Sequence, residues 1–381
     1  MIKTRSIRYF FFPAFLIGIL FGQGGDIPEV VTKVATASCN WLKIETSARA
    51  VGMGGAYVAA GEGMNGVPYN PASIAYIKGS EGYYSRSNYL AGITHNVMSY
   101  GAKFGGSDYL GVHLFYLDSG LMPVTNEWYP DGTGEDFNVI NMALRMTYGR
   151  RMTDRLKLGV SLNYIRDQIY TTEMQTMAFD VGSNFDTGIY GFKLGMSVTN
   201  FGSEVRYHGE GLDVKVDGDL NVDSTLAKVT KEFPLPLTFR LGVKNDIMGP
   251  NGTFLKNSAH RLTVSMDGIN PSDYTVYGSV GCEYGWMDFA FVRVGTHLGH
   301  DTAGMSMGAG IKLKARGMGV SVDYAYVDYG ILKLTHQAGL SLKFFLVVLT
   351  LFQKTTTPML TLTMEAVNIL IMVNLRLVLM A

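Results

Sequence analysis

The sequence has few cysteines, few charges and no long apolar run in its interior, and each shortage excludes a class of protein. Cys39 and Cys282 are its 2 cysteines, too few for the disulfide framework of a small secreted domain. The 32 basic residues balance the 32 acidic ones, so net charge favours no nucleic-acid partner. Between residues 22 and 344 no stretch stays apolar for the roughly 18 residues that a membrane-spanning helix needs. We therefore expect no helical anchor in an inner membrane there.

Glycine and aromatic residues, by contrast, are abundant: 46 Gly, 22 Tyr and 20 Phe. The charged fraction is 17%, against roughly 25% in soluble domains. Membrane β-barrels combine these features, because aromatic girdles lie at both membrane interfaces and glycine permits close contacts. The composition therefore favours a membrane β-barrel over a soluble enzyme.

The N-terminus has the pattern of a signal peptide. Lys3, Arg5 and Arg8 form a basic start, and an apolar run from Tyr9 to Phe21 follows. A run of about 13 residues has the length of a signal-peptide core and is too short to span a membrane. We therefore predict that residues 1–24 are a signal peptide and that the chain is exported.

Residues 79–344 show a two-residue period that is broken by short turns of Gly, Asp and Asn. In the run 155–166, alternate residues such as Leu158 fall on one face, and Lys157 and Gly159 fall on the other. Such an apolar face would pack on a second sheet in a soluble sandwich, whereas in a barrel it contacts lipid. We predict an all-β fold, a transmembrane antiparallel β-barrel of about 14 strands. The expected strands begin near Gly82, Thr94, Asp108, Phe137, Leu156, Met174, Tyr190, Leu235, His260, Tyr274, Asp288, Met305, Met318 and Leu334.

The lengths of the connections predict which end of the barrel faces outward. Outer-membrane barrels have short periplasmic turns and longer outer loops. The two longest connections, residues 119–136 and 202–233, follow the third and the seventh expected strand, so both lie at the same end. Residues 247–257, after the eighth strand, are longer than a periplasmic turn should be. The strand count could therefore be wrong by one hairpin.

The last expected strand resembles the C-terminal insertion signal of outer-membrane barrels, formed here by Gly339, Leu342 and Phe344. In such proteins the aromatic residue ends the chain, but here residues 345–381 follow and lack the two-residue period. We hypothesise that this apolar tail is a frameshift or read-through product. An amphipathic periplasmic helix and a membrane-interface segment are the alternatives.

The motifs of common enzymes are absent: the sequence has no G-x-S-x-G elbow, no H-E-x-x-H pair and no P-loop. His297 and His300 form an H-x-x-H pattern, but on a strand residues three apart point to opposite faces. The acidic run 213–224 fails the EF-hand pattern, because Ser224 replaces the required Gly. We therefore expect no enzymatic activity, no metal and no cofactor.

Six charged residues fall on the polar face of the expected strands, which in a barrel is the lumen face. They could line a conduit, or they could pair with one another and fill a closed lumen. The six are Lys157, Lys193, Arg240, Arg293, Asp323 and Lys343.

Residues 40–75 resemble the N-terminal signature of the PorV/PorQ-type outer-membrane proteins, which are distant kin of the FadL-type fatty-acid transporters. The match consists of an "ARA-GMGGA" core at residues 48–56 and an "NPA" element at residues 70–72. The resemblance covers nearly the whole chain after the signal peptide. Three further motifs look like later elements of the family, in the family's order, at residues 197–210, 233–246 and 323–344.

This resemblance implies a fourteen-stranded barrel in the bacterial outer membrane, formed by residues 79–344. Residues 25–78 would be a leader and a hatch inside the lumen, where small residues permit close approach. Arg49 would reach a lumenal carboxylate, and Asn70 with Pro71 would fix a rigid turn. The hatch would either gate the lumen or only fill it. The candidate gating or ligand-adjacent residues are Arg49, Gly52, Gly54, Gly55, Asn70 and Pro71.

The same resemblance implies a function in protein export. PorV-like proteins carry exported proteins with a C-terminal sorting domain to an attachment complex of type IX secretion. The partners would then be secreted cargo, attachment-complex proteins and outer-membrane lipid. FadL-like uptake of hydrophobic small molecules is the alternative, and a purely structural barrel is the second alternative. The hatch sequence "VGMGGAYVAAGEG" has the form of the broader family rather than that of the secretion-type proteins.

Overall fold

The computed structural model describes residues 34, 36–216, 224–250, 252–315 and 317–345. The predicted signal peptide (1–24) and the apolar tail from residue 346 onward lie outside the described residues, and both stay predictions. Within the described part of the chain, no helix is both long enough and apolar enough to cross a membrane.

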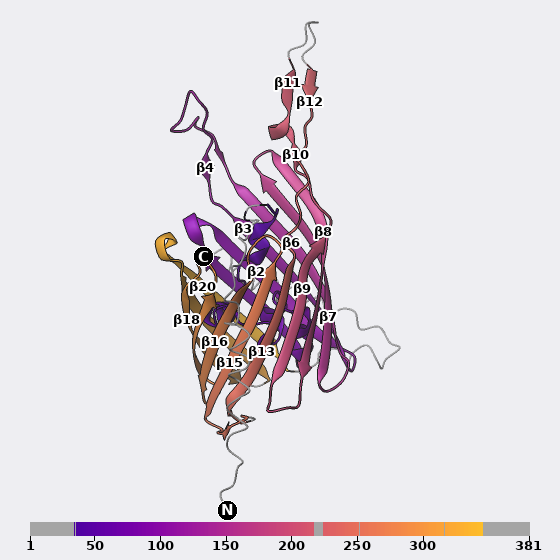
Figure 1. Cartoon of the computed structure of the whole chain (residues 1–381), viewed down its shortest axis with the longest axis vertical. Coiled ribbons are helices and arrows are strands. Elements are labelled where there is room, and N and C mark those ends of the chain that lie inside the picture. The colour runs from indigo at the N-terminus through magenta and orange to yellow at the C-terminus, as the bar shows by residue number, and fades with distance from the viewer. Residues whose placement is uncertain (1–33, 35, 217–223, 251, 316, 346–381) are drawn as a thin grey trace, which may run out of the picture.

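Fourteen antiparallel strands form a closed barrel (Figure 1). They are β1 (Ser80–Asn88), β2 (Thr94–Phe104), β3 (Asp108–Asp118), β6 (Val139–Arg151), β7 (Leu156–Ile169), β8 (Thr172–Asp186), β9 (Lys193–Gly202), β13 (Thr238–Gly249), β15 (His260–Pro271), β16 (Tyr277–Trp286), β17 (Ala290–Leu298), β18 (Met305–Ala315), β19 (Met318–Asp328) and β20 (Leu334–Phe344). Each strand pairs with the next, and β1 pairs with both β2 and β20, which closes the ring. The predicted fold class is confirmed, and each predicted strand start lies within three residues of the observed one.

The strands form a barrel because polar and apolar residues alternate along them. On β7, Lys157, Gly159 and Ser161 are buried, whereas Leu158 and Val160 are exposed. The exposed apolar residues form the outer face, which is the face that contacts lipid in an outer-membrane barrel. The buried residues face the lumen, so the interior of this protein is the lumen of the barrel.

Two long connections project from one end of the barrel, which we call the loop end (Figure 1). The first arm carries β4 (Met122–Pro123) and β5 (Asp136–Phe137). The second arm carries β10 (His208–Gly209), η5 (Glu210–Leu212), β11 (Val214–Val216) and β12 (Ser224–Leu226). At the opposite end, the turn end, one longer connection contains β14 (Leu255–Lys256), which pairs in parallel with β13. The two arms therefore lie at the same end, as the connection lengths predict; that this end faces outward stays a prediction.

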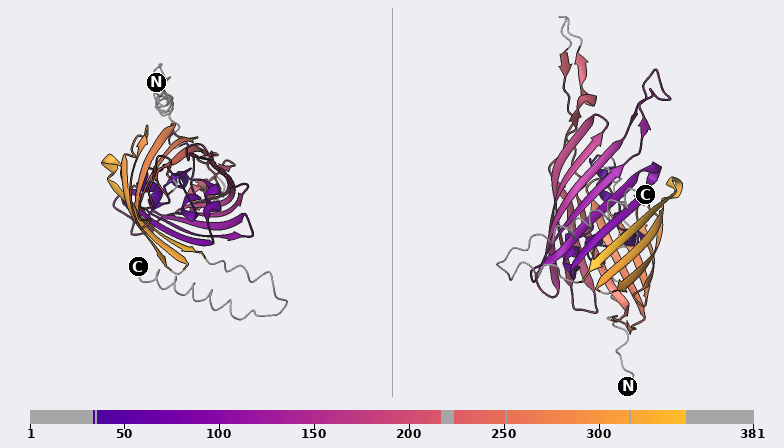
Figure 2. Two further views of the ribbon diagram at one scale, coloured as in Figure 1. Left: turned by 90° about the horizontal axis from the view of Figure 1, so that it is seen from below. Right: turned by 180° about the vertical axis from the view of Figure 1, so that it is seen from behind.

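Residues 37–77 lie inside the barrel, and we call them the lumen segment (Figure 2). They contain the short helices η1 (Asn40–Lys43), α2 (Ala48–Gly52), η2 (Met64–Gly66) and η3 (Pro71–Tyr76). Ser47 caps α2, since its Oγ accepts the Ala50 N–H, and Asn70 caps η3, since its Oδ1 accepts the Ala72 N–H. The remaining short helices, η4 (Leu90–Gly92) and η6 (Gly330–Leu332), lie in connections at the loop end.

A belt of glycines on the lumen face allows the lumen segment to approach the wall. A Cβ atom on Gly281 would lie 2.3 Å from the carbonyl oxygen of Met53, and one on Gly295 would lie 2.1 Å from the carbonyl carbon of Met53. Packed atoms do not approach so closely, so a larger residue would displace the segment. We call this set the glycine belt. Its members lie on ten different strands and are Gly101, Gly111, Gly149, Gly159, Gly182, Gly195, Gly242, Gly281, Gly295 and Gly308.

Candidate functional site

An ion-pair network joins the lumen segment to the wall. Arg49 donates two hydrogen bonds to Glu283, Nε to Oε2 at 2.7 Å and Nη2 to Oε1 at 2.8 Å. The carboxylate of Glu283 is fully buried and also accepts from Arg261 and Arg293. Arg293 in turn donates to Asp323 at 2.7 Å. Arg49 therefore contacts a lumenal carboxylate, as the resemblance implies.

The three candidate glycines lie where the lumen segment turns against the wall. A Cβ on Gly52 would lie 3.1 Å from the Cα of Gly308 in the glycine belt. Gly54 and Gly55 have φ angles of 61° and 73°, a conformation that favours glycine. A Cβ on Gly54 would also lie 2.4 Å from the backbone nitrogen of Thr296. Both conformation and space therefore require glycine at Gly54.

Asn70 and Pro71 fix the far half of the lumen segment. The amide nitrogen of Asn70 donates to the backbone oxygens of Val58 (3.0 Å) and Ser183 (2.9 Å), so it ties two parts of the segment to β8. Pro71 is the first residue of η3, where its fixed φ suits a helix start. Its carbonyl carbon would lie 2.3 Å from a Cβ on Gly159. These contacts form the rigid turn that the sequence predicts.

The predicted lumen charges are distributed along the lumen and do not form one site. Arg293 and Asp323 belong to the Glu283 network, and Lys343 pairs with Glu81 at 3.4 Å. The ammonium group of Lys157 lies 4.3 Å from the centre of the Tyr76 ring. The remaining two, Lys193 and Arg240, are on neighbouring strands, β9 and β13. In this structure most of these charged residues therefore contact other residues that fill the lumen, and they do not line an open conduit.

The residues of the predicted insertion signal lie on β20, where the barrel closes against β1. Gly339 faces the lumen, and a Cβ there would lie 3.0 Å from the hydroxyl oxygen of Tyr83. Leu342 and Phe344 occupy the alternate positions of the strand near the turn end. Their role in insertion stays a prediction.

An apolar cup occupies the lumen near the loop end. The indole ring of Trp41, at the start of the lumen segment, is inserted into this cup. Its Nε1 donates to Asp167 at 2.7 Å, and Leu42 and Ile44 pack beside it. Elsewhere the lumen face is mostly polar or glycine, so an apolar lining here is a local feature. The wall residues of the cup are Val97, Phe115, Leu117, Ala143, Ile165, Met174 and Ala178.

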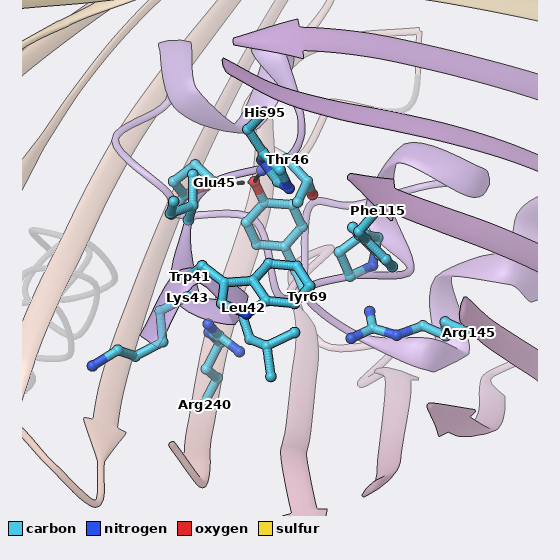
Figure 3. Close-up of a pocket in the computed structure, with 12 residues that line it drawn as sticks. Trp41, Leu42, Lys43, Glu45, Thr46, Tyr69, His95, Phe115, Arg145 and Arg240 are labelled. Carbon is cyan, nitrogen blue, oxygen red and sulfur yellow. Dashed lines mark hydrogen bonds between the residues drawn. The ribbon is translucent and has the colours of Figure 1, made fainter. Parts of the chain in front are cut away.

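A small cavity lies at the bottom of the cup, between Trp41, Leu42 and Tyr69 (Figure 3). Its volume is about 20 Å³, which is room for roughly one water molecule. Arg145 and Arg240 reach the cavity from different sides. This cavity therefore has no room for a larger molecule.

Arg145 and Arg240 have hydrogen-bonding capacity that their neighbours do not use. Arg145 donates to Asn163 (2.7 Å) and pairs with Asp180 (3.2 Å), and its side chain is only 6% exposed. Its Nη1 atom is buried and makes no hydrogen bond in the described part of the chain. Arg240 donates to Thr199 at 3.0 Å and forms no ion pair with any described carboxylate. Two guanidinium groups with free donors therefore meet at the base of an apolar cup.

Glu45 is the acidic residue that lines this cavity. It accepts a hydrogen bond of 2.5 Å from the hydroxyl of Tyr69. Burial raises the pKa of Glu45, although this hydrogen bond and the positive charge of Arg240 oppose the rise. The direct partner of Glu45 is the Tyr69 hydroxyl, and in the described part of the chain Glu45 forms no ion pair with either arginine.

The prediction about the two histidines was wrong in its geometry. β17 ends at Leu298, so His300 lies in the following loop and not on the strand. The ring centres of His297 and His300 are 5.6 Å apart, and Tyr277 packs against both. No group of three potential metal ligands occurs among the described residues.

Sequence reasoning missed the apolar cup and Arg145. Near the loop end some inward positions are apolar as well as the outward ones, as Ile165 beside the outward Tyr164 illustrates, so the alternation that marks the lumen face is weaker there. One signal could have revealed the cup: an apolar residue at a position where the two-residue period expects a polar one. Ile165 is an example, since it lies between the inward polar residues Asn163 and Asp167.

No known family model matches the chain, and no curated protein matches its sequence. Solved outer-membrane barrels have the same fold. The toluene transporter TodX of Pseudomonas putida has a TM-score of 0.51 and 12% identity, over 80% of this chain and 99% of that chain. The toluene transporter TbuX of Ralstonia pickettii has a TM-score of 0.50 and 10% identity, over 79% of this chain and 99% of that chain.

The CymD monoaromatic hydrocarbon channel also has this fold, with a TM-score of 0.50 and 13% identity over 79% of this chain and 97% of that chain. At such low identity these similarities show the fold alone, a closed fourteen-stranded antiparallel β-barrel. The resemblance to the PorV/PorQ proteins depends on the sequence motifs alone.

Proposed function

We propose that the protein is a channel of the bacterial outer membrane for hydrophobic small molecules that carry one anionic head group. The observation that carries this proposal is the apolar cup with Arg145 and Arg240 at its base. Similar folds, in TodX, TbuX and CymD, are described as toluene transporters and as a monoaromatic hydrocarbon channel. This supports uptake more than export.

The apolar cup is a suitable site for the body of such a molecule. In this structure Trp41 and Leu42 fill it, and a ligand with an apolar body would replace their contacts. Burial of one large apolar side chain contributes about 1.5–3 kcal/mol, so a ligand of similar size offsets the loss when these side chains leave. The cavity of about 20 Å³ is too small for the ligand itself, so uptake requires the lumen segment to move.

The two arginines select the head group. The donors of Arg145 and Arg240 would hydrogen-bond a carboxylate or a phosphate, and charge-assisted bonds of this kind are stronger than neutral ones. A neutral hydrocarbon has no acceptor for these donors. Sites that hydrogen-bond one group of a ligand reject analogues that lack it. The protein should therefore prefer an amphiphilic anion to a neutral molecule of the same size.

Replacing Arg240 by methionine tests this preference. Loss of one charge-assisted interaction, about 1.5–3 kcal/mol, should weaken octanoate binding by about tenfold or more. Octanol binding should not change. The measurement is equilibrium binding of both radiolabelled probes to the protein in phosphatidylcholine nanodiscs. Arg206→Met is the matched control, because this arginine lies in the second arm with 56% of its side chain exposed. Equal affinity of the wild type for octanol and octanoate would contradict the head-group assignment.

Protein export of the type IX kind is the second candidate function, and the two arms at the loop end favour it. The first arm exposes Trp128 by 83% and Tyr129 by 61%. Large exposed aromatic side chains are typical of protein contact sites.

Shortening the first arm tests the export candidate separately from uptake. Replacing residues 124–135 by a two-residue Asn-Gly turn should lower the co-purification of secreted proteins from the native envelope by more than tenfold, and octanoate binding should stay unchanged. The readout is mass spectrometry of the proteins that the membrane-extracted barrel retains. If the full-length protein retains no secreted protein, the export candidate fails and the uptake proposal is unaffected.

A further inference from the structure

Two pairs of like charges face each other across the strands near the turn end. The strand register places Lys193 directly opposite Lys244, and Arg151 directly opposite Lys157. All four are inward positions on strands that carry the glycine belt. Like charges directly opposite in a sheet are destabilising. Such an arrangement in a lumen wall needs an anion nearby.

The lumen segment supplies part of this compensation. The carboxylate of Glu62 pairs with Lys244 at 3.0 Å, and 39% of its side chain is exposed while Lys244 is only 6% exposed. Lys157 lies over the Tyr76 ring, and Arg151 donates to the backbone oxygen of Ala75 at 3.4 Å. These are contacts with an aromatic face and a carbonyl, not with a carboxylate. Within the described part of the lumen segment, compensation by a full negative charge therefore comes from Glu62.

On the wall itself, one acid and one amide lie among these cations. Asp186 on β8 is directly opposite Lys193, so its charge offsets part of the positive charge here, although the two form no ion pair in the described part of the chain. Asn184, two residues before it, is directly opposite Lys157. Asn184 is 2% exposed, and neither its Oδ1 nor its Nδ2 has a hydrogen-bond partner in the described part of the chain. A buried amide without partners costs stability unless a ligand satisfies it.

We propose that Lys157, Lys193, Lys244 and Asn184 form a second anion site, at the periplasmic end of the lumen, of which Glu62 occupies only the part next to Lys244 in this structure. Its ligand is the carboxylate or phosphate head group of an amphiphile. The ligand assignment rests on the proposed function, whereas the site itself does not. When the lumen segment moves, Glu62 leaves the site, and the head group of a molecule that has passed the cup takes its place.

The site gives transport a direction. The cup arginines lie in the loop-end half of the lumen, and the lysines lie near the turn end. Between them the wall is formed by the glycine belt. An anion that leaves Arg240 therefore has a second positive site further along its path, so exchange of Glu62 for the head group couples passage to displacement of the lumen segment.

Glu62→Gln removes the internal anion and should open the site to an external one. In phosphatidylcholine nanodiscs, E62Q should bind radiolabelled octanoate at one additional site, at least tenfold tighter than any second site of the wild type. Adding Lys193→Met to E62Q should remove this gain. Inorganic phosphate should compete for the added site, and octanol should not.

Two further variants serve as controls. One tests whether any loss of positive charge has the same effect, and the other tests whether the added site is separate from the cup. A second lipid composition tests whether a lipid head group is the ligand. Lys314→Met in the E62Q background is the charge-matched control, because Lys314 pairs with Asp288 at the barrel rim, and it should leave the gain intact. E62Q with Arg240→Met should lose cup binding and keep the added site. Loss of the gain only in nanodiscs with phosphatidylglycerol would support the site and identify a lipid head group as its ligand.

The proposal is overturned if E62Q gains no octanoate site, if the gain persists in E62Q with Lys193→Met, or if Lys314→Met removes it equally. A failure of the cup proposal looks different. In that case Arg240→Met would leave wild-type binding unchanged, and the E62Q gain would still be measured.

Discussion

Replacing Gly281 by valine should expel the lumen segment from the barrel, whereas replacing Gly278 by valine on the same strand should leave it in place. A Cβ on Gly281 would lie 2.3 Å from the carbonyl oxygen of Met53 and 2.7 Å from its Cβ. Gly278 faces the other side of β16, where the nearest atoms to a Cβ are 3.7 Å away. The two variants therefore add the same atoms to the same strand, on opposite faces.

The expected size of the Gly281→Val effect is large. Overpacking against backbone atoms costs about 3 kcal/mol, which corresponds to a roughly 100-fold rise in the expelled fraction. Trypsin should then cut after Lys43 and Arg49, and ion conductance in planar bilayers should appear. Resistance of the barrel to SDS without heating should persist, since the strand ladder is unchanged. A barrel that no longer resists SDS would mean that folding of the wall requires the segment, and that the two parts do not separate.

Arg49→Met should release the lumen segment without damage to the wall, whereas Glu283→Gln should damage the wall. Without Arg49, the carboxylates of Glu283 and Asp323 remain balanced by Arg261 and Arg293. Without the Glu283 carboxylate, Arg49 and Arg261 lose their ion-pair partner, and Arg293 keeps Asp323 alone. Removing one partner of a buried ion pair costs about 3–5 kcal/mol, because an uncompensated charge is left behind.

Hydrogen exchange and thermal unfolding separate these two effects. In Arg49→Met, exchange of amides in residues 47–56 should accelerate by about tenfold to 100-fold, since the lost bonds contribute about 1.5–3 kcal/mol. The unfolding temperature of the barrel should change little in this variant and should fall in Glu283→Gln. Unchanged exchange in Arg49→Met would show that Arg49 does not hold the segment.

The fourteen strands of the barrel can be predicted from local sequence patterns. The contacts inside the lumen cannot, because they join residues that are far apart in the sequence. Strand starts such as Thr94 and Leu156 are visible because polar and apolar residues alternate and turns are short. The place of residues 40–75 in the lumen follows from the family resemblance. The partner of Arg49 does not, since Glu283 is 234 positions away and only closure of the barrel brings the two together.

The pairing of the two lysines at the turn end cannot be predicted from the sequence for a similar reason. Lys193 and Lys244 become direct neighbours only through the register of β9 and β13, which a long arm separates in the sequence. The error about His297 and His300 has a local cause: the strand ends at Leu298, and boundaries are harder to predict than the existence of a strand.

The glycine belt also determines the bore of an emptied barrel. Ten strands contribute only backbone to the lumen at the height of the lumen segment. Their peptide groups are already hydrogen-bonded in the strand ladder, so they offer little adhesion to a passing molecule. The wall therefore presents bare backbone at the positions that the lumen segment now covers most closely. Displacement of the segment would therefore uncover bare backbone at these positions, with the charged side chains of Glu283, Arg293 and Asp267 beside it.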